Sequence, residues 1–159
     1  MQMKTGVEQS VYALLILNFL PPKAVLPGEV ISELLGASPS YFQKLLRKLV
    51  SADLIVSVPG AKGGFKLKKQ PDDIQIYDVY VAIEGKQSLY SSSGILQDML
   101  NLEEKKVRLL SNLMEEAETS WKTTLKRESI GSLAAEIDKK CPPESLTRIQ
   151  GIVHDKMVL

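Results

Sequence analysis

Apolar residues recur every three or four positions along the first fifty residues, a spacing that predicts helices rather than strands. The first periodic segment runs from Val7 to Phe19, and Pro21-Pro22 ends it. A second, shorter helix is expected from Pro27 to Leu35, with Gly36 as its C-terminal cap. These two segments predict a small helical core at the start of the chain.

The third helix is expected from Pro39 to Ser51, with Ser38 as its N-terminal cap. Its apolar residues recur at i, i+3, i+4 and i+7 and must be buried. The opposite face is polar and basic, and consists of Ser40, Tyr41, Gln43, Lys44, Arg47 and Lys48. Two helices joined by a tight turn, the second of them polar and basic, are typical of a helix-turn-helix.

Two short β-prone runs follow, from Leu54 to Val58 and from Phe65 to Leu67. The segment between them contains three glycines, which allow the positive φ values of a hairpin loop. A phosphate-binding loop is not favoured, because Gly60 to Gly64 lacks the P-loop spacing and no helix follows it. We therefore expect a two-stranded wing beside the helix-turn-helix, with a possible extra strand at Ile74 to Ile76.

The rest of the chain is expected to be helical, beginning with a helix from Tyr77 to Glu84 that Gly85 closes. After a polar, serine-rich loop, a long helix is predicted from about Ile95 or Leu100 to Arg127. It carries a coiled-coil-like apolar seam, formed by Val107, Leu110, Met114, Ala117 and Trp121. A lone helix cannot bury such a seam, so we expect it to pair with its copy in a homodimer; packing on its own head domain is the alternative.

The predicted fold class is mainly α with a small β-hairpin wing (α+β), a winged helix-turn-helix followed by a long dimerisation helix. We expect a DNA-binding domain over residues 1–85, a linker over 86–98, and the long helix with a closing helix over 99–140. The closing helix is expected from Ser129 to Lys140, and residues 141–159 are expected to form a weakly specified tail.

Charge is distributed unevenly. The net charge is only +1, but the segment from Pro39 to Lys69 contains seven lysines and arginines and a single acidic residue, Asp53, and therefore carries +6. This asymmetry indicates a face that binds a polyanion, although a solvated lysine-rich face is the alternative.

The chain lacks the residues that several classes of protein require. The chain has one cysteine, Cys141, and one histidine, His154, so neither a disulfide framework nor a cysteine-rich metal site is expected, and no catalytic triad can be argued. We therefore expect no enzymatic activity and no metal. No secretory signal is evident, and the apolar run from Val11 to Leu20 is too short to cross a membrane, so a cytoplasmic protein is expected.

Three motifs together resemble the Rrf2 family of bacterial winged-helix transcription regulators. They are the run from Ser38 to Leu49, the hairpin Gly-Ala-Lys-Gly-Gly-Phe-Lys-Leu from Gly60, and the segment from Ile76 to Gly85. The resemblance implies a homodimer that binds a roughly palindromic operator in double-stranded DNA. It also implies DNA contacts from the wing tip and from the positions that match Ser38, Ser40, Tyr41, Gln43 and Lys44.

The chain departs from the family's pattern at two places. Many members carry an arginine just before the wing glycines, where this chain has Pro59, and Lys62 is the candidate substitute. Cluster-binding members carry three cysteines in the loop after the Glu-Gly motif, whereas Gln87 to Gly94 contains none here. The resemblance is thus to the cluster-free branch, and no iron–sulfur cofactor is expected.

We conclude from the sequence that the protein is a sequence-specific DNA-binding regulator, with a homodimeric repressor as the expected form. Ser40 and Gln43 are the candidates for base contacts. Phosphate contacts are expected from Arg47, Lys48, Lys66 and Lys68. A winged-helix module that docks a protein partner is the alternative, and the effector, whether a small molecule or a protein, is left open.

Overall fold

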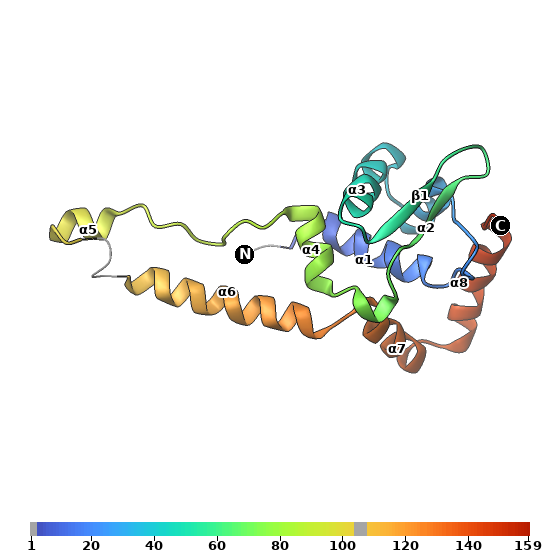
Figure 1. Cartoon of the computed structure of the whole chain (residues 1–159). Helices are drawn as coiled ribbons and strands as arrows, with labels where there is room; N and C mark the ends of the chain where they lie inside the picture. The colour runs from blue at the N-terminus through green and yellow to red at the C-terminus, as the bar shows by residue number, and fades with distance from the viewer. Residues whose placement is uncertain (1–2, 104–107) are drawn as a thin grey trace.

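The computed structural model of the protein describes residues 3–103 and 108–159. They form a helical head from which a narrow arm projects (Figure 1). The elements of the described residues are, in chain order, α1 (Thr5–Leu17), α2 (Gly28–Leu35), α3 (Pro39–Ser51), β1 (Ile55–Val58), β2 (Gly64–Leu67), the 3-10 turn η1 (Pro71–Asp73), α4 (Ile76–Glu84), α5 (Ile95–Leu100), α6 (Leu109–Arg127), α7 (Ile130–Lys140) and α8 (Pro143–Lys156). The predicted class, mainly helical with a two-stranded wing, is confirmed.

Helix α1 is the centre of the head. It is apolar on most of its circumference, which is the pattern of a helix covered on several sides, and Val7, Leu14 and Leu17 are almost completely buried. Helices α2, α3, α4 and α7 all contact it. The described helices include none that is both long enough and apolar enough to span a membrane.

The turn between α2 and α3 has the geometry that its sequence predicts. Gly36 adopts a left-handed conformation with φ of 64°, and the N–H of Ala37 donates to the carbonyl of Ser32 at 2.9 Å. This is a Schellman-type helix end, in which glycine takes the left-handed position at little energetic cost. The short turn lets α2 and α3 pack against each other as a helix-turn-helix.

The wing is an antiparallel hairpin in which Ile55 pairs with Leu67 and Val58 with Gly64. Strand β2 is attached to the head near its loop end, because the backbone groups of Leu26 and Phe65 exchange two hydrogen bonds, of 3.0 and 2.9 Å. The strand expected at Ile74 to Ile76 does not form. That segment makes one isolated bridge through Gln75, and Ile76 already begins α4.

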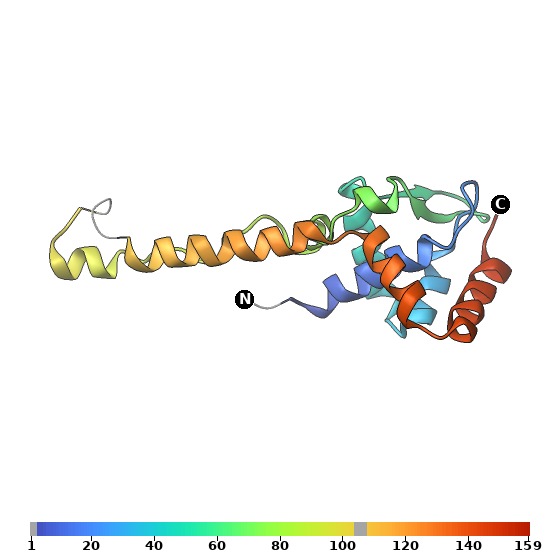
Figure 2. The same ribbon diagram turned by 90° about the horizontal axis from the view of Figure 1, so that it is seen from below.

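The long helix is shorter than the sequence analysis predicts. Helix α5 ends where Asn101 takes a left-handed conformation with φ of 51°, and the N–H of Leu102 donates to the carbonyl of Gln97. Asparagine tolerates this conformation and therefore terminates helices. A separate helix, α6, begins at Leu109, and it lies alongside the extended loop that leads to α5 (Figure 2).

The C-terminal residues are not a weakly specified tail. They form α8, whose Val153 is buried against the head. Beyond α8 the backbone of Val158 exchanges two hydrogen bonds with Val25, of 2.8 and 2.9 Å. The closing helix expected from Ser129 to Lys140 is confirmed as α7, with Ser129 as its N-terminal cap.

Candidate nucleic-acid interface

Helix α3 presents a polar surface because its apolar side is packed against the rest of the head. Phe42, Leu45, Leu46 and Leu49 are buried at helical spacing, as the sequence predicts. The opposite side exposes Ser40, Lys44 and Arg47. The wing lies next to α3 on the same side of the head (Figure 1). A helix and a hairpin can therefore face one partner together.

Tyr41 and Gln43 lie on the flanks of α3, where each approaches a glycine of a neighbouring helix. A Cβ atom built on Gly28 would come within 2.9 Å of Nε2 of Gln43, and one built on Gly6 would come within 2.8 Å of the Tyr41 hydroxyl. Gln43 is half-buried as a result, whereas Tyr41 remains 45% exposed. The two glycines thus set the positions of both side chains, with Gln43 partly immobilised.

Lys48 has a partner inside the protein. Its ammonium group donates a hydrogen bond of 3.0 Å to the carbonyl of Ile83, near the C-terminal end of α4. A cation at this end also interacts favourably with the helix dipole. Lys48 therefore connects α3 to α4, a role that the sequence pattern did not indicate.

The wing cations differ in their surroundings. Lys62 is exposed in the hairpin loop, and Lys66 is half-buried on β2. Lys68 forms an ion pair of 2.9 Å with Asp53, and this hydrogen-bonded ammonium holds the pKa of the Asp53 carboxyl below its usual range. Asp53 also ends α3 in a left-handed conformation with φ of 60°. The only acidic residue of the basic segment thus neutralises one of its lysines.

A basic hollow of about 540 Å³ lies between α3 and α4. Arg47 and Lys48 line it from α3, and Lys69 and Lys86 line it from the segments after β2 and α4. Lys86 lies outside the basic segment from Pro39 to Lys69, so the charge pattern does not predict its place here. Only the packing of α4 against α3 brings it close to Arg47.

The residues of the predicted dimer seam have varied surroundings. Leu110 and Ala117 are exposed on α6, and Met114 is half-buried beneath the serine-rich loop. Trp121 packs edge-on against Tyr80 of α4, with ring centroids 4.5 Å apart. Val107, the remaining predicted member, lies outside the described residues.

The model of the Rrf2 family, described as an iron-dependent transcriptional regulator, matches residues 3–136. The residues of this chain do not suit an iron–sulfur cluster, because its single cysteine, Cys141, cannot supply a set of thiolate ligands. Within residues 3–103 and 108–159 no group of three or more histidine, cysteine or acidic side chains is arranged to hold a metal ion.

Two curated relatives are named as HTH-type transcriptional regulators. YwgB of Bacillus subtilis (strain 168) is 47% identical over 130 residues, with 82% of each chain covered. YffB of Lactococcus lactis subsp. lactis (strain IL1403) is 38% identical over 138 residues, with 86% of this chain and 88% of the relative covered.

Solved structures have the same fold. CymR, the global cysteine regulator of B. subtilis, superposes with a TM-score of 0.68 at 20% identity, over 86% of this chain and 98% of CymR. IscR of T. potens superposes with a TM-score of 0.64 at 20% identity, over 89% of this chain and 92% of IscR. From the family match over residues 3–136 and the close relatives, we conclude that the chain belongs to the Rrf2 family of DNA-binding, winged-helix transcription regulators.

Proposed function

We propose that the protein is a homodimeric repressor that binds a palindromic operator with α3 in the major groove and the wing against the adjacent backbone. The observation that carries the proposal is the exposed polar face of α3 beside the basic wing. A major groove admits an α-helix, and the flanking phosphates attract lysine and arginine. Because each protomer offers one such helix, two protomers suit two half-sites of opposite orientation.

We assign base contacts to Ser40 and Gln43, which lie on the N-terminal half of α3. The partial burial of Gln43 against Gly28 supports this assignment, since a side chain with restricted rotamers loses less entropy when it binds a base. Ser38, Tyr41 and Lys44 surround these two residues and are proposed as further contacts from the start of α3. The assignment predicts that Gln43→Ala relaxes the preference at one base pair.

Phosphate contacts are assigned to Arg47, Lys62 and Lys66, whose charges have no ion-pair partner within 4.0 Å among the described residues. Lys48 and Lys68 are also proposed to reach phosphates, but each already has a partner, the carbonyl of Ile83 and the carboxylate of Asp53. A phosphate that binds either cation would compete with this partner inside the protein. These two cations should therefore contribute less to affinity than Arg47.

The test is fluorescence anisotropy with DNA from upstream of the protein's own coding region, measured over a series of salt concentrations. A specific complex is expected, with affinity that falls as salt rises. Arg47→Gln should reduce the slope of log affinity against log salt by about 1. Lys139→Gln, on α7 at the side of the head away from α3 (Figure 1), is the control. A complex that does not depend on salt would contradict the proposal, and the absence of any specific complex would favour a protein-docking module.

Repression is tested separately by transcription in vitro from a template that contains the bound fragment. Added protein should lower the yield of transcript, because a dimer on the operator occludes polymerase. An increased yield would show activation and would overturn this part of the proposal while leaving DNA binding intact.

A further inference from the structure

Three of the four cations that line the basic hollow between α3 and α4 have no partner inside the described part of the protein. The side chains of Arg47, Lys69 and Lys86 make no hydrogen bond and no ion pair with any other described residue. The fourth cation, Lys48, is bonded to the carbonyl of Ile83 at the end of α4. Three unpaired cations from three separate segments therefore line one cavity, which favours an anionic occupant.

The lining of the hollow contains one acidic residue, Asp78, and its carboxylate already has a partner. It accepts a hydrogen bond of 2.9 Å from the N–H of Gln75, in the capping box that begins α4. The hollow is thus lined by four cations and one anion. A cleft with such an excess of one charge concentrates ions of the opposite charge.

Other residues of the lining are apolar. Val81 and Ala82 of α4 and Ala52, at the end of α3, contribute aliphatic side chains, and Tyr77 contributes an aromatic ring. The volume of about 540 Å³ lies in the range of small-molecule sites. An inorganic ion would leave most of this volume and the apolar wall uncovered. The hollow therefore suits an organic anion.

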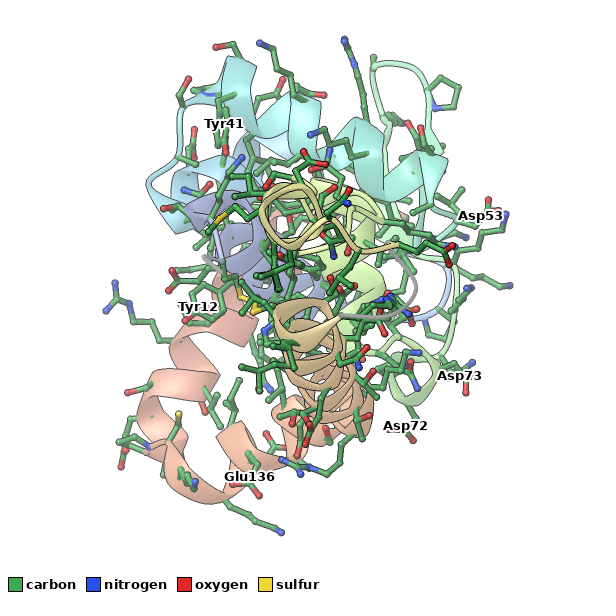
Figure 3. All side chains as sticks on the ribbon, turned by 90° about the vertical axis from the view of Figure 1, so that its left-hand side faces the viewer. Tyr12, Tyr41, Asp53, Asp72, Asp73 and Glu136 are labelled. Atoms are coloured by element: carbon green, nitrogen blue, oxygen red, sulfur yellow. The ribbon has the colours of Figure 1, made fainter. Side chains whose placement is uncertain are left out.

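The hollow lies at the C-terminal end of α3, away from the proposed base contacts in the first half of that helix. Its lining includes Ser51 and Ala52, where α3 ends. Figure 3, which looks along the arm, shows Tyr41, near the start of α3, and Asp53, just after its end, on opposite sides of the head. Arg47 lies between the two ends and lines the hollow. A molecule in the hollow would leave the start of α3 uncovered and would engage an arginine that is proposed to bind operator phosphate.

We propose that the hollow between α3 and α4 binds a small phosphate ester, about the size of a nucleotide, and that this ligand competes with the operator for Arg47. A guanidinium can bind two phosphate oxygens at once, and the ammonium groups of Lys69 and Lys86 add positive charge. The apolar wall would cover the organic part of the ligand. The competition rests on the proposed function, whereas the ligand site does not depend on it.

Isothermal titration calorimetry of the full chain with adenosine monophosphate, at constant ionic strength, tests the site without DNA. One molecule should bind per chain, and adenosine, which lacks the phosphate, should not bind. Lys86→Gln should weaken binding at least about tenfold, because a hydrogen bond between charged groups is lost. Lys62→Gln, which removes the same charge from the exposed hairpin loop, is the matched control and should bind like the wild type.

Two calorimetric results would overturn the ligand site. One is that adenosine monophosphate does not bind, or binds no better than adenosine. The other is that Lys86→Gln and Lys62→Gln weaken binding equally, which would show only a diffuse attraction to the basic surface.

The competition is tested by fluorescence anisotropy with the operator fragment, again at constant ionic strength. Adenosine monophosphate should lower the operator affinity of the wild type and should have little effect on Lys86→Gln at the same concentration. Binding of the nucleotide without an effect on the operator complex would overturn the competition and leave the site intact. If Lys86→Gln lowers operator affinity and the nucleotide does not bind to the wild type, the hollow holds DNA phosphate and the inference is wrong. Absence of any operator complex would refute the proposed function, whereas the calorimetric result would still decide the ligand site.

Discussion

Arg47 and Lys48 are neighbours on α3 with the same charge, but the structure gives them different surroundings. Arg47 is exposed at the edge of the basic hollow, whereas the ammonium of Lys48 is bonded to the carbonyl of Ile83. Their sequence positions on the polar face made them look equivalent. Only the approach of α4, which is set by tertiary packing, distinguishes them.

Lys48→Gln should lower the free energy of unfolding by about 1 kcal/mol, because a partly buried hydrogen bond to the end of α4 is lost. Arg47→Gln should change it by less than about 0.5 kcal/mol, as is usual for an exposed residue. Urea denaturation of the two variants without DNA makes the comparison. Equal stabilities would show that the hydrogen bond from Lys48 to Ile83 contributes nothing to stability.

Substitution of alanine for glycine should change the stability of the fold in opposite directions at two positions. A Cβ on Gly64, the first residue of β2, would lie 2.6 Å from the backbone of Leu26, whereas a Cβ on Gly151 of α8 would meet nothing within 4 Å. Gly64→Ala should therefore destabilise the fold by about 1–3 kcal/mol. Gly151→Ala should stabilise it by about 0.5–1 kcal/mol, since alanine favours a helix interior. Thermal unfolding measures both, and a stabilised Gly64→Ala would contradict the close approach of Leu26 to β2.

Among the helices, α4 connects α3 to the arm. On one side it accepts the hydrogen bond from Lys48, and on the other Tyr80 packs against Trp121 of α6. Lys126 of α6 also lies 4.8 Å from the centre of the Tyr77 ring. A change in the tilt of α6 would therefore act on α3 through a single short helix.

Tyr80→Ala should expose the indole of Trp121 and shift its fluorescence to longer wavelength. Because Trp121 is the only tryptophan, the emission reports this contact alone. The lost aromatic pair should also lower stability by about 0.5–1.5 kcal/mol beyond the lost apolar area. Tyr12→Ala, on α1 away from α6, should leave the emission unchanged. An unshifted spectrum in Tyr80→Ala would mean that the base of the arm is not packed on α4.

The C-terminal strand contact is tested by Val158→Pro, which removes the N–H that donates to the carbonyl of Val25 at 2.9 Å. Amide exchange at Val25 should become faster, and stability should fall by about 1 kcal/mol. Leu159→Ser, at a position 84% exposed, is the control and should exchange like the wild type. Unchanged exchange in the proline variant would show that the last residues are not bound to the head.

Local signals in the sequence were sufficient for the first half of the fold. The bounds of α3 and the cap at Gly36 follow from apolar spacing, proline and glycine, which act within a few residues. The break at Asn101 was missed because the apolar pattern continues across it. Helix α8 was missed because its stability depends on Val153 meeting a head formed by distant residues. The same holds for the candidate site. The polar face of α3 follows from local spacing, whereas the contact of Lys48 with Ile83 could not be predicted because it joins residues far apart in the sequence.

In the molecule as a whole, the head and the arm expose surfaces of different chemical character. The head exposes a polar, basic face, and the arm exposes leucines and methionine. In a two-fold dimer the arms would fix the separation and the relative orientation of the two α3 helices. Operator binding should then depend on residues that never approach DNA.

Leu113→Glu should weaken the proposed dimer, because it places a charge among the exposed apolar side chains of α6. Affinity for a full operator should fall at least about tenfold, since two linked contacts become independent. Affinity for an isolated half-site should stay the same. Thr119→Glu, on another exposed side of α6, is the control. An unchanged affinity of Leu113→Glu for the full operator would argue against pairing through this face.

The contact between Val158 and Val25 has a consequence for biosynthesis. Residues 24–26 emerge from the ribosome long before Val158, yet they are backbone partners in the finished head, and Leu26 is in turn bonded to the wing through Phe65. Until Val158 has been translated, the amide and the carbonyl of Val25 lack these backbone partners. A nascent chain that ends before Val158 would lack this support beside the hairpin, so the proposed DNA-binding region is complete only after residue 158 has been translated.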